Sequence, residues 1–360
     1  MLRRDRVSLA LALATTVAVG CGSSGNNSGS GGQGGSPSSS STAESSSSSS
    51  SSSSVSSSSS GGITCPTMEG PVYAGTKLMF GEGPNGQWKK VGINIDGLTS
   101  TGASKDVCQP NSMGSPGTAY PDGDNGIDNS FGKNLLPQIL ALYPTWTQDV
   151  NASIQKGNFT VLLKMYCMPP KGDAVFATKL FGGETLGMMP KQDGTDKWPV
   201  TPELLSDPMD PESSTIIFDT SSVTGTMYDS GKDRTFILTV PVSSPMGKST
   251  SIKLTLHAAQ ATMTFSADRK SATMGTLSGV LNTEELVAEV KKIGDLLGLC
   301  NSPLLTNLIT QVRQASDIMS DGTQDPSQTC DGISMGLNFE MTEALLGPVG
   351  MPQNVGMACP

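Results

Sequence analysis

A tract rich in serine and glycine at residues 22–62 limits where this chain of 360 residues can fold. Within it, residues 45–60 are all serine except Val55. Such a composition offers almost no apolar surface to offset the entropy lost on ordering, which predicts a disordered linker. As a flexible chain the linker would span about 35 Å. A folded region is therefore expected only in residues 63–360, which are enough for one large domain or two modest ones.

The first 20 residues have the pattern of a secretory signal peptide. Arg3, Arg4 and Arg6 precede an apolar run at residues 7–19. A helix that crosses a bilayer needs about 20 residues, so this run is too short to span a membrane. A basic start, a short apolar stretch and small residues before a cleavage site predict that residues 1–20 are removed on export.

The predicted cleavage site, Ala18-Val19-Gly20-Cys21, resembles the lipobox of bacterial lipoproteins, although that family usually has Leu in place of Ala18. The resemblance implies that Cys21 carries lipid, such as palmitate, and anchors the protein to a membrane. Gly22 replaces the Asp that retains such proteins at the inner membrane, which implies the outer membrane or the cell surface. An ordinary signal peptide with a chance cysteine is the alternative. The chain as a whole resembles Ser-tethered lipoproteins of Gram-negative bacteria, which implies no activity.

The chain is acidic, with a net charge of −9. Residues 1–20 hold three Arg and one Asp, so their removal leaves a net charge of −11. Binding to nucleic acid or to anionic lipid needs patches of Lys and Arg, so we expect neither as a partner. Solubility and cation binding are two explanations for the acidity that stay open.

Six further cysteines predict disulfide bonds, because an exported chain enters an oxidising compartment. They are Cys65, Cys108, Cys167, Cys300, Cys330 and Cys359. We favour the pairs Cys300–Cys330 around a helix, Cys65–Cys108 near the start of the domain, and Cys167–Cys359 between the C-terminus and a central strand. A zinc site is the weaker alternative, because there is no Cys-x-x-Cys and only one histidine.

Alternation of apolar and polar residues predicts a β-rich domain. The expected strands are residues 91–95, 159–167, 216–218, 235–242, 252–257, 261–265 and 333–341. A turn at residues 229–233 predicts a hairpin with the strand that follows it. Strands at short intervals favour a mainly β fold with helical insertions, namely an antiparallel, jelly-roll-like β-sandwich.

A helical hairpin is predicted at about residues 282–321. Asn282 can cap the first helix with Glu285 three residues later, and Ser302 can cap the second, with Pro303 at its first position. Shorter helices are expected at residues 135–143 and 148–156.

The search for catalytic residues identifies none. The single histidine, His257, lies on the polar side of a predicted strand and is expected to be an exposed structural residue. Hydrolysis by Ser-His-Asp or Cys-His chemistry needs a histidine oriented by a partner, and there is no G-x-S-x-G motif. Glu340 and Glu343 lie three apart in a strand and therefore face opposite ways, which is unsuited to joint action.

One acidic loop predicts a possible structural calcium site. Its candidate ligands are Asp122, Asp124, Asp128 and Asn129, whose side chains offer the oxygen atoms that Ca²⁺ prefers. The loop departs from an EF-hand because Gly126 replaces a ligand and Lys133 stands where a bidentate Glu is required. Turns rich in Asp and Asn also occur without a metal.

The sequence thus predicts a lipid-anchored protein that works outside the cytoplasm, with a β-rich domain that binds a glycan or a protein at the end of a flexible tether. The alternative is a hydrolase that acts on polysaccharide or cell wall through Asp and Glu residues. The three tryptophans, Trp88, Trp146 and Trp198, are few for a groove in which sugars stack on aromatic rings.

Overall fold

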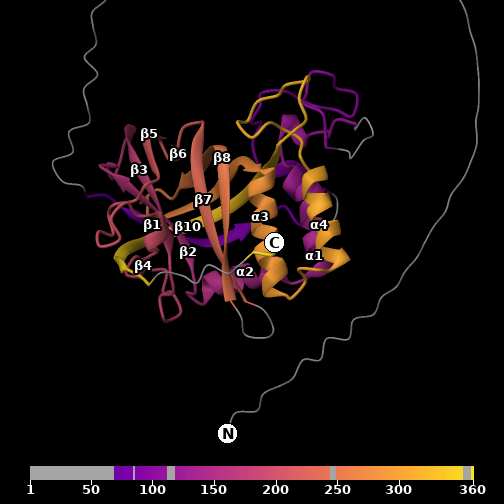
Figure 1. Cartoon of the computed structure of the whole chain (residues 1–360). Helices are drawn as coiled ribbons and strands as arrows, with labels where there is room; N and C mark the ends of the chain where they lie inside the picture. Colours follow the sequence, from indigo (N-terminus) through magenta and orange to yellow (C-terminus); the bar gives the residue numbers. More distant parts are fainter. Residues whose placement is uncertain (1–68, 84–85, 112–117, 244–248, 352–357) are drawn as a thin grey trace, which may run out of the picture. The chain divides into compact units, whose positions relative to one another are not determined.

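The structure of this chain, a computed structural model, describes residues 69–83, 86–111, 118–243, 249–351 and 358–360 (Figure 1). The predicted signal peptide, Cys21, the linker and Cys65 lie outside the described residues. The described residues form one compact unit.

Ten strands in the described part of the chain pair in one sheet. They are β1 (Val72–Met79), β2 (Thr160–Tyr166), β3 (Ala174–Gly183), β4 (Lys197–Val200), β5 (Ile217–Thr224), β6 (Met227–Asp229), β7 (Arg234–Ser243), β8 (Ser249–Phe265), β9 (Ser271–Asn282) and β10 (Gly332–Val349). All the pairs between these strands are antiparallel except β4 with β10, which is parallel.

The strand pairings close on themselves. They run from β1 through β2, β3, β5, β6, β8 and β9 to β10, and β10 pairs again with β1. Strand β4 joins β3 and β10, and β7 joins β8. The predicted mainly β fold is therefore confirmed, whereas a division into the two sheets of a jelly-roll sandwich is not.

Both faces of several strands are buried, because successive side chains point to opposite faces. In β1, Tyr73 joins the main core while Val72 joins a second cluster, where Trp198 of β4 also packs. Aromatic rings fill the main core: the ring centres of Tyr73 and Phe265 lie 5.1 Å apart. The interior of the ring of strands is thus a packed core.

The described residues contain four α-helices, which are labelled in Figure 1. They are α1 (Leu136–Leu142), α2 (Trp146–Gln155), α3 (Thr283–Leu296) and α4 (Pro303–Gln314). Four short helical segments complete the described helices: η1 (Gln87–Lys90), η2 (Asp124–Gly126), η3 (Phe131–Leu135) and η4 (Pro202–Leu204). None of the helices in the described residues has the length and apolar composition needed to cross a bilayer.

The predicted helical hairpin is confirmed by α3 and α4, including its two caps. The Asn282 side chain accepts hydrogen bonds from the backbone N–H groups of residues 284 and 285, and Ser302 accepts one from that of residue 304. Helix α4 ends earlier than predicted, because the residues after it pair with the start of β10. There, the Gly332 N–H donates to the Ile318 carbonyl at 2.9 Å.

All three favoured disulfide pairs are wrong. Cys108 is bonded to Cys330 and Cys300 to Cys359, while Cys167 is also disulfide-bonded. Cys359 lies against α3 rather than β2, since its N–H donates to the Lys291 carbonyl at 3.3 Å. It is therefore the helical hairpin that holds the C-terminus.

Three predicted local structures also need correction. Residues 91–95 form no strand, because their backbone N–H groups bond to side chains instead of to a neighbouring strand. The Ile93 N–H donates to Ser278 Oγ, and the Ile95 N–H donates to Asp128 Oδ2. The strands predicted at 252–257 and 261–265 are both part of β8. A bulge at Ala258, where φ is 45°, reverses which side chains face inward. The predicted hairpin does not form either, because β6 and β7 each pair with β8 instead of with each other.

A buried arginine joins three chain turns at one end of the ring. The Arg269 guanidinium donates to the carbonyls of Pro169, Gly172 and Gly225 at 2.6–2.9 Å. These turns connect β2 to β3, β5 to β6 and β8 to β9. The Arg269 carbonyl in turn accepts a hydrogen bond from the hydroxyl of Tyr73 in the core.

Candidate functional site

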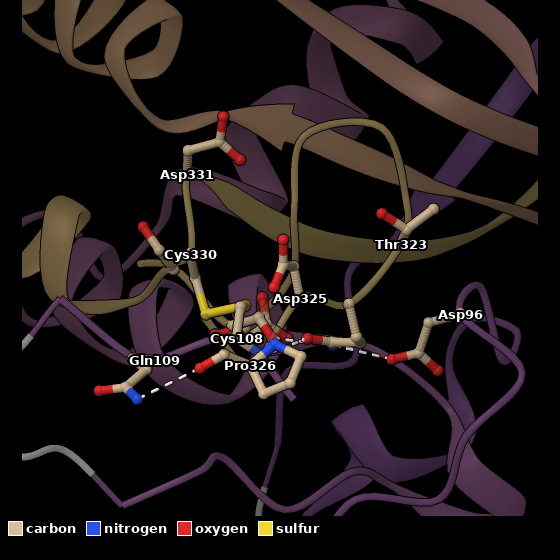
Figure 2. Close-up of a disulfide and its surroundings, with 12 residues drawn as sticks. Asp96, Cys108, Gln109, Thr323, Asp325, Pro326, Cys330 and Asp331 are labelled. Atoms are coloured by element: carbon tan, nitrogen blue, oxygen red, sulfur yellow. Dashed lines mark hydrogen bonds between the residues drawn. A yellow bond between two sulfur atoms is a disulfide. The ribbon is translucent and has the colours of Figure 1, made fainter. Parts of the chain in front are cut away.

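Two irregular loops from opposite ends of the described chain lie side by side (Figure 1). The first loop is residues 93–109, and the second loop, residues 317–331, connects α4 to β10. Figure 2 shows the Cys108–Cys330 disulfide that joins them. Next to this bond, the Gln109 N–H donates to the Gln328 carbonyl, and the Cys330 N–H donates to the Gln109 carbonyl, both at 2.8 Å. The two loops thus form one cross-linked structure, which we call the clamped loops.

Gln324 makes a second connection between the clamped loops. Its Oε1 accepts a hydrogen bond from the Cys108 N–H at 2.9 Å, and its Nε2 donates to Asp96 Oδ2 at 2.8 Å. The same nitrogen lies 3.2 Å from the carbonyl of Asp317. One side chain of the second loop therefore holds both ends of the first loop, including the carboxylate of Asp96.

A pocket of about 430 Å³ lies between the clamped loops and the end of the sheet. Its lining residues are Ile95, Asp96, Leu98, Asp106, Asp233, Ala258, Asp321, Gly322, Thr323 and Gln324. Four of them carry carboxylates and none is Lys or Arg, so the pocket has a negative potential. Ile95, Leu98 and Ala258 add apolar surface.

The sheet contributes two of the lining residues through local distortions. Ala258 is the bulged residue of β8, and Asp233, which directly precedes β7, has a left-handed φ of 57°. From the second loop, Asp321 Oδ1 accepts hydrogen bonds from the N–H and Oγ1 of Thr323, which lower the pKa of this carboxyl. Asp321 is therefore ionised at neutral pH.

A cluster of carboxyl groups interacts with Asp96 of the pocket lining. Burial raises the pKa of Asp128 to about 8, of Asp317 to about 7 and of Asp122 to about 6, and repulsion among these groups and Asp96 adds to each shift. Each of the three accepts hydrogen bonds: Asp128 from Ile95 N–H at 2.6 Å, Asp122 from the Ser100 N–H, and Asp317 from the N–H and Oγ of Ser334. The cluster therefore fixes the shape of the clamped loops and holds protons near neutral pH.

The predicted calcium ligands have separate roles in the described structure. Asp122 and Asp128 join the carboxyl cluster, while Asp124 is exposed in η2. Asn129 Oδ1 accepts from the N–H groups of Gly132 and Gly336, and Asn129 Nδ2 donates to the Val91 carbonyl. Within the described residues, no group of three or more His, Cys, Asp or Glu side chains is arranged to hold a metal ion. Calcium binding by this loop stays a prediction.

Other residues considered from the sequence lie apart from the pocket lining. His257 Nε2 is 3.2 Å from Glu285 Oε2, so it connects β8 with the start of α3. In β10, Glu340 forms an ion pair of 3.5 Å with Lys77, and Glu343 lies opposite Tyr73 of β1.

Sequence reasoning missed Asp96, Asp317, Asp321 and Gln324. The sequence does contain a sign of this site, because several Asp residues precede Cys108 and others lie on both sides of Cys330. The correct pairing of these two cysteines would have brought both acidic segments together. Neither a protein-family model, nor a curated protein, nor a solved structure matches the chain.

Proposed function

We propose that this protein is a lipid-anchored binding module that works outside the cytoplasm and holds a positively charged group of a glycan or protein in the acidic pocket. The observation that carries the proposal is the pocket of about 430 Å³ lined by Asp96, Asp106, Asp233 and Asp321 with no basic residue. The signal-peptide pattern and Cys21 support the location.

The construction of the pocket favours binding by a preformed site. The disulfide, the paired backbones and Gln324 restrain the clamped loops before any ligand arrives, which lowers the ordering cost of binding. The carboxylates of the lining attract a cation, while the apolar side chains of Ile95 and Leu98 can contact the carbon skeleton that bears it. An ammonium or guanidinium group suits this combination.

Amine-bearing and neutral forms of one ligand would test the charge preference. We expect deacetylated chitosan oligosaccharides and a lysine-rich peptide to bind in calorimetry at low salt, and acetylated oligosaccharides of equal length not to bind. Changing Asp233→Asn together with Asp321→Asn should weaken binding about tenfold, which corresponds to about 1.4 kcal/mol. The control variant, Asp219→Asn with Asp268→Asn, removes two exposed carboxylates outside the pocket lining. Equal binding by both variants, or by the acetylated sugar, would refute the proposed pocket.

The anchor is tested separately. Mass spectrometry of the mature protein should show an acylated Cys21 at the N-terminus, and Cys21→Ser should release the protein from membranes. An unmodified N-terminus at residue 22 or later would disprove lipid attachment without affecting the binding test.

A further inference from the structure

A second charged cluster lies far from the pocket lining, on β2 and β3. Lys164 and Lys179 are directly opposite each other in the ladder between these strands. Their ammonium nitrogens lie 5.1 and 5.0 Å from the ring centre of Tyr166. Lys164 and Tyr166 alternate with Leu163 and Met165, so they face away from the main core.

All three side chains converge on Glu212. Lys164 Nζ contacts Glu212 Oε1, and the Tyr166 hydroxyl donates to Glu212 Oε2 at 2.6 Å. Lys179 Nζ donates to the Glu212 backbone carbonyl, also at 2.6 Å. Burial and the bond to Glu212 raise the pKa of Tyr166, so its hydroxyl stays a donor. Lys164 is only 8 % exposed, and a charge this buried needs a partner anion.

Glu212 belongs to a loop with a fixed base and an exposed tip. We call residues 205–214 the acidic strap; Leu205 and Ser214 pair at its base, and the Ser206 N–H donates to the Ser213 carbonyl at 2.8 Å. At the tip, Met209 is 85 % exposed. The strap also carries Asp210, whose negative charge adds to the raised pKa of Tyr166. Glu212 lies next to this base, and its side chain is 36 % exposed, so rotation of the side chain can move the carboxylate out of the cluster while the strap backbone stays paired.

We propose that Lys164, Tyr166 and Lys179 form a binding site for an oxyanion, and that Glu212 of the acidic strap occupies this site in the structure. Two ammonium groups and a phenol hydroxyl, held on adjacent strands, supply the charge-assisted hydrogen bonds that a carboxylate, sulfate or phosphate group accepts. A ligand that bears such a group binds here by displacing the Glu212 carboxylate. This site is independent of the acidic pocket, which favours cations.

The test is to remove the occupant and supply a free anion. In Glu212→Ala the site is vacated, and sodium sulfate is titrated into the full-length protein at constant ionic strength with sodium chloride as the balance. We expect sulfate to bind this variant at least about tenfold more tightly than the wild type, because it no longer competes with the Glu212 carboxylate for the same donors. Its melting temperature should rise saturably with sulfate. Acetate in place of sulfate shows whether the site also takes a carboxylate.

The matched control is Glu284→Ala, which breaks the exposed ion pair with Arg313 and leaves no buried cation. It should respond to sulfate as the wild type does. Adding Lys164→Met to Glu212→Ala should abolish the saturable response. If Glu212→Ala does not fold, Glu212→Gln, which keeps the side-chain volume without the charge, takes its place. The proposal is overturned if sulfate affects the Glu212 variant and the Glu284 variant equally, or if the wild type binds sulfate as tightly as the Glu212 variant.

Discussion

Removal of the Cys108–Cys330 disulfide should cost this protein more stability than removal of Cys300–Cys359. The first bond joins residues 222 apart in sequence and the second joins residues 59 apart. A cross-link lowers the entropy of the unfolded chain by an amount that grows with the logarithm of the loop length. At 25 °C this relation gives about 5 kcal/mol for the longer loop and about 4 kcal/mol for the shorter one.

The assay is urea unfolding of two double variants, each with both cysteines of one pair changed to alanine. We expect the free energy of unfolding to fall further for the Cys108/Cys330 variant, by about 1 kcal/mol relative to the other. The same variant should also lose ligand binding at the acidic pocket, because its clamped loops are no longer joined. An equal or reversed order of stability would refute the entropic reasoning. Disulfide-linked peptides in a digest of the oxidised wild type check the pairing directly.

Two further outcomes concern stability. Burial and repulsion raise the pKa values of Asp122, Asp128 and Asp317 above their unfolded values, so these groups destabilise the folded state as they ionise. The free energy of unfolding, measured in urea titrations, should therefore fall between pH 5 and about 8.5. Asp128→Asn should make this fall less steep. A slope that is unchanged in Asp128→Asn would contradict this origin. Arg269→Met leaves three carbonyls without their donor and should cost roughly 3–6 kcal/mol in the same assay, whereas Arg313→Met, at an exposed ion pair, should cost about 0–1 kcal/mol.

The elements that the sequence predicted well are those whose pattern is unbroken. In β10, Ile333, Met335, Leu337, Phe339 and Met341 alternate without interruption, and all five side chains are in the main core. The helical pair was predictable because its caps and apolar stripes are local features. Strand β9 was missed because a bulge near Met274, where φ is 48°, interrupts its alternation. The even-numbered Ala272 faces the core before the bulge, and odd-numbered residues such as Leu277 face it afterwards.

The candidate site was less predictable, because it depends on contacts between distant parts of the chain. Residues 91–95 alternate like a strand, yet their backbone bonds to side chains such as Asp128 and Ser278. The pairing of Cys108 with Cys330 cannot be read from spacing, since many pairings are compatible with six cysteines. Asp96 and Asp321 reach the same pocket through the Cys108–Cys330 disulfide and the hydrogen bonds of Gln324.

The closure of the ring by its first and last strands has a consequence for the order of folding. Lys77 of β1 lies opposite Glu340 of β10, so β1 can pair with β10 only after the chain has been synthesised as far as β10. Contacts this distant in sequence are slow to form, because the intervening chain must lose its freedom first. During synthesis, the edges of the N-terminal strands therefore stay unpaired and exposed to proteases and to other unfolded chains. The arrival of β10 closes the ring and brings Cys330 next to Cys108, so the acidic pocket is among the last parts of the molecule to form.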